Sequence, residues 1–226
     1  MTTMPMPMPW HALKPFEPAA GPLRSLDAAA SLLHRPGETP LLQLCYRLKG
    51  LQRLRLPAPS RPAARLDELW QHTCFEAFVG CPDQQDYWEF NLSPSGDWAA
   101  YRFLAYRQGQ QQELSYAALP VELHPHDLTP AAVADARADL QTLELSCCFA
   151  LPPALAGASQ LQLGLTAVLE TDLPQPDLPQ TDLAQPDLAD SPGGGLSYWA
   201  LKHPATQADF HDRRGWTVLL RLEPTG

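Results

Sequence analysis

The segment YWEFNLSPSGDWAAYRF, residues 87–103, constrains the fold more than any other part of the chain. If residues 87–92 are extended, successive side chains point to opposite sides, so that one face is apolar and the other polar. The apolar face carries Trp88, Phe90 and Leu92, and the other face carries Tyr87, Glu89 and Asn91. Residues 93–97 then supply Pro94, Gly96 and Asp97, which are typical of tight turns. The segment therefore predicts a hairpin with one face for a core and one face for a polar ligand.

Seven further segments have the length and the pattern of β-strands. They are residues 41–49, 73–79, 99–106, 143–149, 161–170, 197–201 and 217–222. Eight strands separated by turn signals predict an all-β protein, an antiparallel β-sandwich with jelly-roll character. Two short stretches, residues 27–33 and the Ala-rich residues 130–140, are predicted to be helical.

The chain is predicted to hold a single sandwich domain over residues 21–226, preceded by a Pro-rich arm over residues 1–20. Residues 171–195 are predicted to form a flexible loop, because TDLPQPDLPQ is followed by the near repeat TDLAQPDLAD and by SPGGG. The alternative is a docking arm for an unknown protein partner. Two degenerate copies are too few for a repeat fold.

Charge and composition exclude several classes of partner. The chain has 16 Lys and Arg against 25 Asp and Glu, a balance that argues against binding a phosphate backbone. No apolar run reaches the roughly 18 residues of a membrane span, and the first residues, MTTMPMPMPW, lack the features of a secretory signal. We therefore expect a cytoplasmic protein that binds neither nucleic acid nor membrane.

The five cysteines have no zinc-site spacing and are odd in number, so they are predicted to be free thiols of a reducing compartment. A bridge between Cys74 and Cys81, which are close in sequence, stays open at this point.

Two blocks, LWQHTCFEAFVGCP (residues 69–82) and YWEFNLSPSGDW (residues 87–98), together resemble family 9 carbohydrate-binding modules and the wider DOMON-like superfamily. In those proteins a strand ending in Glu-x-Phe pairs with one reading Tyr-x-Glu-Phe, and a turn with Pro and Gly follows. Residues 197–222 are similar to the C-terminal strands of an uncharacterised bacterial branch of DOMON-like proteins. The resemblance spans residues 41–222 apart from the repeat, and it implies a β-sandwich that binds a sugar or, in some DOMON branches, haem. The chain departs from the carbohydrate-binding pattern before Glu76, where His72, Thr73 and Cys74 stand in place of an Asp.

Sugar recognition needs flat aromatic faces and hydrogen-bonding groups in a preformed cleft. The candidates on the strands are Trp70, Glu76, Tyr87, Glu89, Asn91, Trp98 and Trp199. We expect the two glutamates and Asn91 to present hydrogen-bonding groups, Trp98 or Trp199 to offer a stacking surface, and Phe75, Trp88 and Phe90 to support them from the core. The alternatives are that the tryptophans are core residues, and that Arg102 or Arg107 is the partner of the glutamates.

Residues 203–211, HPATQADFH, add His203, Asp209 and His211 as further ligand-binding candidates. Imidazole and carboxylate are common metal ligands, but this spacing matches no metal motif, and His203 and Asp209 could instead bond loop backbone. We assign no metal and expect no cofactor. Ligation of haem by Met and His would need a methionine in the core, whereas all four methionines lie within the first eight residues. Ligation by two of His72, His203 and His211 has no positive support.

These patterns predict a non-catalytic module that binds a small polar ligand, above all a saccharide. Three alternatives stay open: a structural or protein-interaction sandwich, a haem-binding DOMON domain, and a glycoside-processing enzyme that uses the carboxyl groups of Glu76 and Glu89. The chain has no nucleophile elbow, phosphate-binding Gly-rich loop or dinucleotide fingerprint, which lowers the expectation of an enzyme.

Overall fold

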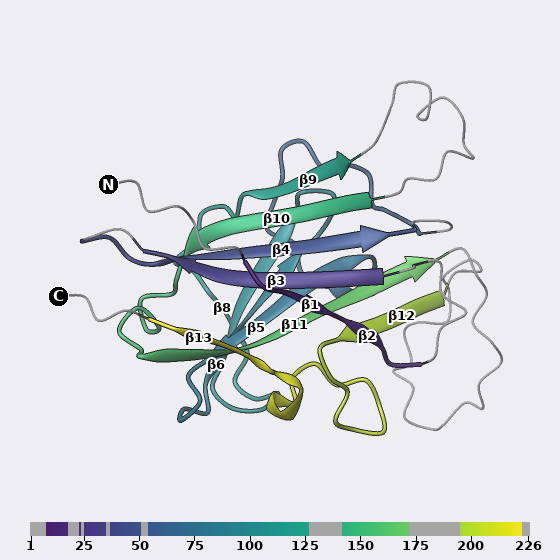
Figure 1. Cartoon of the computed structure of the whole chain (residues 1–226). Coiled ribbons are helices and arrows are strands. Elements are labelled where there is room, and N and C mark those ends of the chain that lie inside the picture. The colour runs from purple at the N-terminus through teal and green to yellow at the C-terminus, as the bar shows by residue number, and fades with distance from the viewer. Residues whose placement is uncertain are drawn as a thin grey trace.

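Two antiparallel sheets packed face to face make up this protein (Figure 1). The structure, a computed structural model, describes residues 8–17, 23, 25–34, 37–50, 54–126, 142–171 and 195–222. Within these ranges there are thirteen β-strands and two 3-10 helices of three residues each. The predicted β-sandwich is therefore confirmed.

The first sheet has five strands in the order β1-β3-β4-β10-β9. Their bounds are Trp10–Ala12 (β1), Ser25–Leu33 (β3), Leu41–Lys49 (β4), Val121–His126 (β9) and Thr142–Ala150 (β10). The helix predicted over residues 27–33 is wrong, because this segment belongs to β3 and pairs along its whole length with β4. Alanine favours helices only weakly, and here hydrogen bonding to strands on both sides overrides that preference. The other predicted helix, residues 130–140, lies outside the described residues.

The second sheet has eight strands in the order β2-β12-β11-β5-β6-β7-β8, with β13 paired to β11. Their bounds are Lys14–Pro15 (β2), Cys74–Gly80 (β5), Tyr87–Leu92 (β6), Trp98–Phe103 (β7), Gln111–Gln112 (β8), Gln160–Thr171 (β11), Gly195–Ala200 (β12) and Val218–Arg221 (β13). All eight strands that the sequence predicts are present, and β4 and β6 have the predicted bounds.

Part of the Pro-rich arm joins the two sheets. Strand β1 pairs with β3 in the first sheet, and β2, which begins two residues later, pairs with β12 in the second (Figure 1). Between them Leu13 is buried in the core, and its backbone N–H donates to the carbonyl of Leu26. At the other long connection, Thr171 of β11 pairs with Gly195 of β12. The repeat that separates them, residues 172–194, lies outside the described residues.

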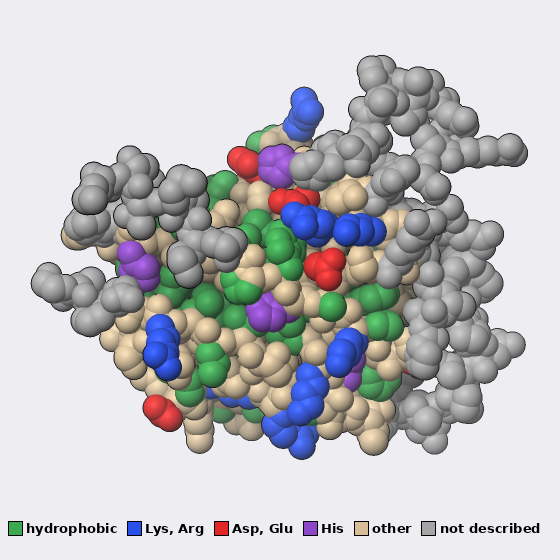
Figure 2. Space-filling view, viewed as in Figure 1, with side chains coloured by type: hydrophobic (Ala, Val, Ile, Leu, Met, Phe, Trp, Pro, Cys, Tyr) green, Lys and Arg blue, Asp and Glu red, His purple; other side chains and the backbone are tan. Residues whose placement is uncertain are grey.

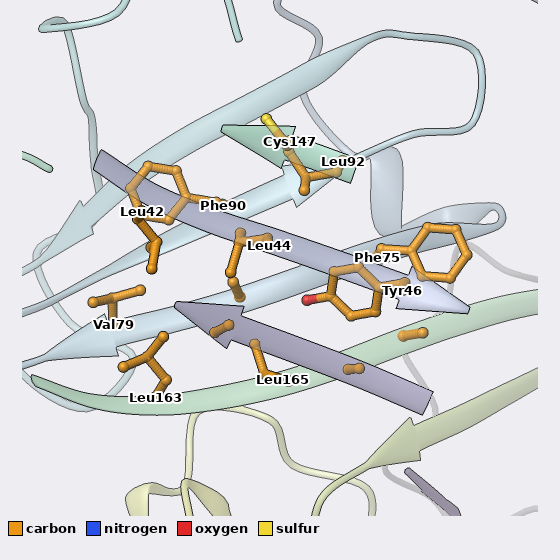
Figure 3. Close-up of a cluster of buried hydrophobic side chains, with 14 of the residues drawn as sticks. Leu42, Leu44, Tyr46, Phe75, Val79, Phe90, Leu92, Cys147, Leu163 and Leu165 are labelled. Carbon is orange, nitrogen blue, oxygen red and sulfur yellow. The ribbon is translucent and has the colours of Figure 1, made fainter. Parts of the chain in front are cut away.

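The core lies between the sheets, and side chains of β4 meet those of β5, β6 and β11 there (Figure 3). The ring of Tyr46 packs 5.0 Å from that of Phe75, and its hydroxyl donates to the backbone carbonyl of Glu76 at 2.7 Å. Trp88, Phe90 and Phe75 belong to this core, as expected. Burial of large apolar side chains on this scale is the main driving force for folding.

No disulfide joins any of the five cysteines. Cys74 begins β5 and Cys81 follows its end, so about 3.3 Å per residue of extended chain separates their Cα atoms by on the order of 20 Å. A disulfide needs Cα atoms within about 7 Å, which excludes the bridge that the sequence left open.

The outer faces of the two sheets differ. On the five-stranded sheet, basic and acidic side chains are interspersed (Figure 2), as in the 3.0 Å ion pair of Arg47 with Glu144, where the guanidinium lies 4.0 Å from the ring centre of Trp10. The outer face of the eight-stranded sheet carries instead a second apolar cluster. Its buried members are Phe78, Tyr87, Ala99, Tyr101, Phe103 and Trp216. No helix among the described residues is long and apolar enough to cross a membrane.

The segment that follows β12, residues 201–217, covers part of this outer face and includes the 3-10 helix η2 (Arg213–Gly215). The Arg213 guanidinium donates to the backbone carbonyls of Cys81 at 2.8 Å and Asp86 at 2.7 Å, which anchors the segment to the end of β5. The indole of Trp216 stacks on Phe78, with ring centres 5.7 Å apart, and lies directly over Gly164 of β11. A glycine at position 164 is what allows this close approach.

We expect Gly164→Ala to displace Trp216 and to lower the free energy of unfolding by about 1–3 kcal/mol, the usual range for overpacking. A Cβ atom at position 164 would lie 2.4 Å from Cδ1 of the indole. The ring has little room to move, because its Nε1 donates to the carbonyl of Phe210 at 2.8 Å. Denaturant unfolding and the tryptophan emission spectrum would measure the two effects.

Gly157→Ala is the matched control, since nothing lies within 4 Å of a Cβ atom at that position. If both variants unfold like the wild-type protein, Trp216 is not held against β11 as described.

Candidate functional site

The candidate site lies on the outer face of the eight-stranded sheet, where the strand register brings polar residues of β5, β6 and β11 together. Two rows of paired positions cross these strands. The first row holds Thr166, Glu76 and Asn91, and the second holds Phe78, Glu89 and Tyr101. Glu76 and Glu89 are therefore diagonal neighbours on adjacent strands, a relation that places Cα atoms about 7–8 Å apart.

Hydrogen bonds connect these polar residues in two pairs, which lie side by side because Glu76 pairs with Asn91 in the strand register. The Asn91 side-chain amide donates to Oε1 of Glu89 at 2.7 Å, and the Thr166 hydroxyl donates to Oε2 of Glu76 across 3.4 Å. Among the described residues, Oδ1 of Asn91 has no hydrogen-bond partner although it is fully buried. An unsatisfied buried acceptor destabilises a fold by about 1–3 kcal/mol, so this atom calls for an explanation.

Both glutamates are buried in strands, and this has raised their pKa values. Burial, which penalises the charged carboxylate, raises the pKa of Glu89 to about 7, against the opposing effects of Asn91 and Arg107. The pKa of Glu76 is raised well above its ordinary value, first by burial and then by the nearby charge of Glu89. At neutral pH, Glu89 is therefore poised between its two forms, and burial favours the protonated form of Glu76.

His211 closes the cluster on the side of Glu89. Its Nδ1 lies 2.7 Å from the hydroxyl of Tyr87, which itself accepts the backbone N–H of Arg107 at 3.2 Å. Burial, followed by the charge of Arg107, lowers the pKa of His211 to about 4, so the ring is neutral at pH 7. In the tautomer whose Nδ1 accepts from the Tyr87 hydroxyl, the imidazole proton is on Nε2, and Nε2 lies 3.7 Å from Oε2 of Glu89.

Tyr106 and Arg107, in the turn after β7, bind Asp209 in the segment that carries His211, and these three residues are called the polar strap. Asp209 accepts hydrogen bonds from the Arg107 guanidinium at 3.0 Å, from the backbone N–H of His211 at 3.1 Å, and from the Tyr106 hydroxyl. These bonds lower the pKa of Asp209 despite its partial burial, so it is a carboxylate at neutral pH. Arg107 thus has its own counter-ion and acts on the glutamates only at longer range.

The structure brings together six of the ten residues that the sequence proposed for ligand binding. They are Glu76, Tyr87, Glu89, Asn91, Asp209 and His211. Of the two suggested counter-ions, Arg102 pairs instead with Asp86 at 2.8 Å. Within the described residues the glutamates therefore have no close basic partner other than the neutral His211.

The expected stacking surface is wrong. Trp98 and Trp199 are only 2% and 6% exposed and pack in the main core between the sheets. The Arg65 guanidinium lies 4.2 Å from the ring centre of Trp98, and the indole N–H of Trp199 donates to Ser197. The alternative interpretation of these tryptophans, that they are core residues, therefore holds.

His203 and Trp70 do not join the cluster either. Nε2 of His203 bonds to the backbone carbonyl of Lys14 at 2.8 Å, the pinning of loop backbone that the sequence left as its alternative. Trp70 is half-buried in the 3-10 helix η1 (Leu69–Gln71). Across the described part of the chain, no group of three or more His, Cys, Asp or Glu side chains could hold a metal ion.

Sequence reasoning did not propose Thr166, Tyr101 or Tyr106 for the site. The alternation along residues 161–170 could have placed Thr166 on the outer face, but the neighbour of that strand is known only from the sheet order. Tyr106 enters through the strap, which joins residues about one hundred positions apart. A contact of that kind leaves no local signal in the sequence.

No protein family model matches the chain, and no curated protein matches it. Among solved structures, the chain is similar to a crystal structure described as that of a putative carbohydrate-binding protein from Bacteroides uniformis. The TM-score is 0.55 with 12% sequence identity, over 96% of this chain and 87% of that chain. At this identity the likeness shows a shared β-sandwich fold.

We expect Glu89→Gln to stabilise the protein at about pH 8 by 1–3 kcal/mol and to have little effect at about pH 4, since one pKa unit corresponds to about 1.4 kcal/mol. With a folded pKa of about 7 against an ordinary value of 4.5, Glu89 holds its proton in the folded state after the unfolded chain has released it. Stability is therefore lost as the pH rises through that window, and the amide removes the loss. Denaturant unfolding at several pH values would measure it.

His211 works in the opposite direction, because a pKa lowered from 6.5 to about 4 makes stability fall as the pH falls through that window. Both Glu89→Gln and the wild-type protein contain His211, so its contribution to stability cancels when the two are compared at the same pH. Glu122→Gln is the matched control, since its side chain is 65% exposed on the other sheet. Equal stability of Glu89→Gln and the wild-type protein at every pH would mean that Glu89 is not desolvated.

Proposed function

We propose that this chain is a non-catalytic β-sandwich module that binds a saccharide through the outer face of its eight-stranded sheet. The observation that carries the proposal is the buried, unpartnered Oδ1 of Asn91, next to two glutamates that lack a close basic partner. A ligand hydroxyl that donates to Oδ1 would satisfy an acceptor that the protein itself leaves open.

Sugar hydroxyls both donate and accept hydrogen bonds, and the cluster offers both functions. Glu76 can donate in the protonated form that burial favours, Asn91 Oδ1 and Glu89 can accept, and Nε2 of His211 lies 3.7 Å from Glu89. An aromatic face for the apolar side of a sugar ring is available at Tyr106, which is exposed beside the strap. Tyr106 takes the role that the sequence assigned to Trp98 or Trp199.

Two further observations support this proposal. The resemblance of residues 69–98 to family 9 carbohydrate-binding modules and DOMON-like proteins falls on β5 and β6, the strands that carry Glu76, Glu89 and Asn91. The similar solved protein is also described as carbohydrate-binding, and it shares the sandwich over almost the whole chain. Cysteines that form no disulfide favour a reducing compartment such as the cytoplasm as the place where the module works.

The two acids also favour a second candidate function, the processing of a glycosidic bond. A general acid must be protonated at working pH, and burial provides this at Glu76. Glycosidases use two carboxyl groups about 5–10 Å apart, a range that includes diagonal neighbours on adjacent strands. Release of the aryl alcohol from a panel of aryl glycosides would support catalysis, and its loss in Glu76→Gln would assign the acid.

In the binding proposal, titration with mono- and oligosaccharides is expected to give saturable binding, with dissociation constants of on the order of millimolar or lower. Calorimetry would measure it, and emission from Trp216 beside the cluster gives a second readout. Asn91→Ala removes the open acceptor and is expected to weaken binding by about tenfold, or 1.4 kcal/mol.

Gln43→Ala removes an amide from the outer face of the other sheet and is the matched control. Arg107→Ala changes an exposed residue of the strap and tests the same site if Asn91→Ala does not fold. No saturable binding by any saccharide would overturn the proposal, as would binding that Asn91→Ala and Arg107→Ala both leave unchanged.

A further inference from the structure

The exposed fraction of the side chains rises from Asn91 to Arg107, so the side of the cluster at Arg107 is nearest to solvent and is called its mouth. Asn91 and Glu76 are 1% and 3% exposed, and Glu89 is 7% exposed. The side chains of His211 and Arg107 are 15% and 52% exposed. The side of the cluster nearest solvent is therefore the side of His211 and Arg107, and a ligand would approach the glutamates from there.

The inner end of this path is rich in acceptors and poor in positive charge. It holds the open Oδ1 of Asn91 and the two carboxyl groups, and the amide of Asn91 is already used by Glu89. Thr166 supplies a hydroxyl to Glu76 across 3.4 Å, which is a weak bond. The guanidinium of Arg107 pairs with Asp209 at 3.0 Å, at the exposed side of the cluster. Among the described residues, no Lys or Arg forms an ion pair with Glu76 or Glu89.

We propose that the ligand carries a protonated primary amine, which enters between Glu76 and Glu89 and donates to Oδ1 of Asn91. An ammonium group has three donors on one compact centre, and the sheet offers three acceptor groups at paired and diagonal positions of β5 and β6: Asn91 Oδ1 and the carboxyl groups of Glu76 and Glu89. This inference rests on the proposed function, and it narrows the ligand class to a saccharide with a free amino group. The amine would lie inside, and the ring would remain near Tyr106 and Arg107 at the mouth.

A neutral hydroxyl can satisfy only one of these acceptor groups. It can donate to Asn91, but it brings no charge that would favour the ionised forms of the two buried acids. A guanidinium is planar and spreads its charge over five N–H donors, whereas an ammonium places its charge and three donors on one compact centre. The charged ammonium would favour the ionised form of both acids, so that binding releases protons from Glu76 and Glu89 near neutral pH.

Other titratable groups that face the acids do not account for such a release. They are Cys74, Tyr46, Tyr87, Tyr101, Tyr198, His211, Asp209 and Arg107. The thiol and the phenols have raised pKa values and stay protonated, whereas His211 is already neutral and Asp209 already ionised at pH 7. Protons released on binding near pH 7 therefore come from the two glutamates.

The experiment compares glucose, glucosamine and N-acetylglucosamine by calorimetry on the full chain, in two buffers of different ionisation enthalpy at about pH 6.5, where an amino sugar is cationic. We expect glucosamine to bind at least about tenfold more tightly than the other two, and to release protons in proportion to the ionised acids. Methylammonium serves as a fourth probe, because it has the amine without the sugar.

Glu76→Gln and Glu89→Gln are expected to remove the preference for glucosamine over glucose, measured as the ratio of the two dissociation constants within each variant, because an amide cannot ionise to pair with the ammonium. These substitutions keep the size of the side chain and resemble the protonated acid, so the fold is retained, and Glu122→Gln on the other sheet is the control. Equal binding of all three sugars would overturn the inference and leave the proposed function intact. Binding of methylammonium without any sugar would overturn the proposed function and retain the amine pocket, and binding of none of the four probes would overturn both.

Discussion

Both faces of strands β5 and β6 are buried, and the rest of the structure depends on how this is achieved. One face packs against the five-stranded sheet through Phe75, Trp88 and Phe90. The opposite face is covered by residues 201–217 and by aromatic neighbours on the same sheet. Because side chains alternate strictly along a strand, Glu76 and Glu89 can only point away from the core, into this second covered region. The same register that builds the core therefore desolvates two acids.

Residues 201–217, called the cover, are held on that second face by hydrogen bonds and an ion pair rather than by strand pairing. Arg213 donates to backbone carbonyls at the end of β5, and Asp209 connects the segment to the turn after β7. Each of these charged groups has an ionic or backbone partner and is partly exposed, whereas the glutamates beneath are buried and have only neutral hydrogen-bond partners among the described residues. In the described part of the chain, ionic partners are thus present in residues 201–217 and absent around the two acids of the sheet, whose pKa values are raised.

The sequence predicts the strands well because period-two alternation is a local property. It fails at β3, where Ala28, Ala29 and Ala30 lie between flanking strands and are all buried. Alanine carries too little apolar surface to show which side faces the core, so only the pairing with β4 and β1 decides its structure. The short strands β1 and β2 are also invisible in advance, since their Pro-rich segment gains hydrogen bonds only at two sheet edges.

For the site, alternation correctly places Glu89 and Asn91 on one face, and the pairing of β5 with β6 adds Glu76 opposite Asn91. The tryptophans show what alternation along a strand cannot predict. A large aromatic side chain suits a core and a sugar platform equally well, and which of the two Trp98 serves depends on the sheet that lies over it. Arg107 shows another limit, because its pairing with Asp209 spans about one hundred residues and sets which acids keep a counter-ion.

The acceptor groups lie on the sheet and residues 201–217 lie over them, and this arrangement affects how the site would recognise a ligand. The acceptors sit on central strands with neighbours on both sides, so their positions are set by the fold before any ligand arrives. The unfavourable desolvation of Glu76 and Glu89 is likewise present in the unliganded protein. A ligand that supplies the missing donors and charge gains the interaction without bearing that desolvation again, which is the advantage of a preorganised site. Selectivity would then come from the inner acceptors, and the cover would set how large a group can reach them.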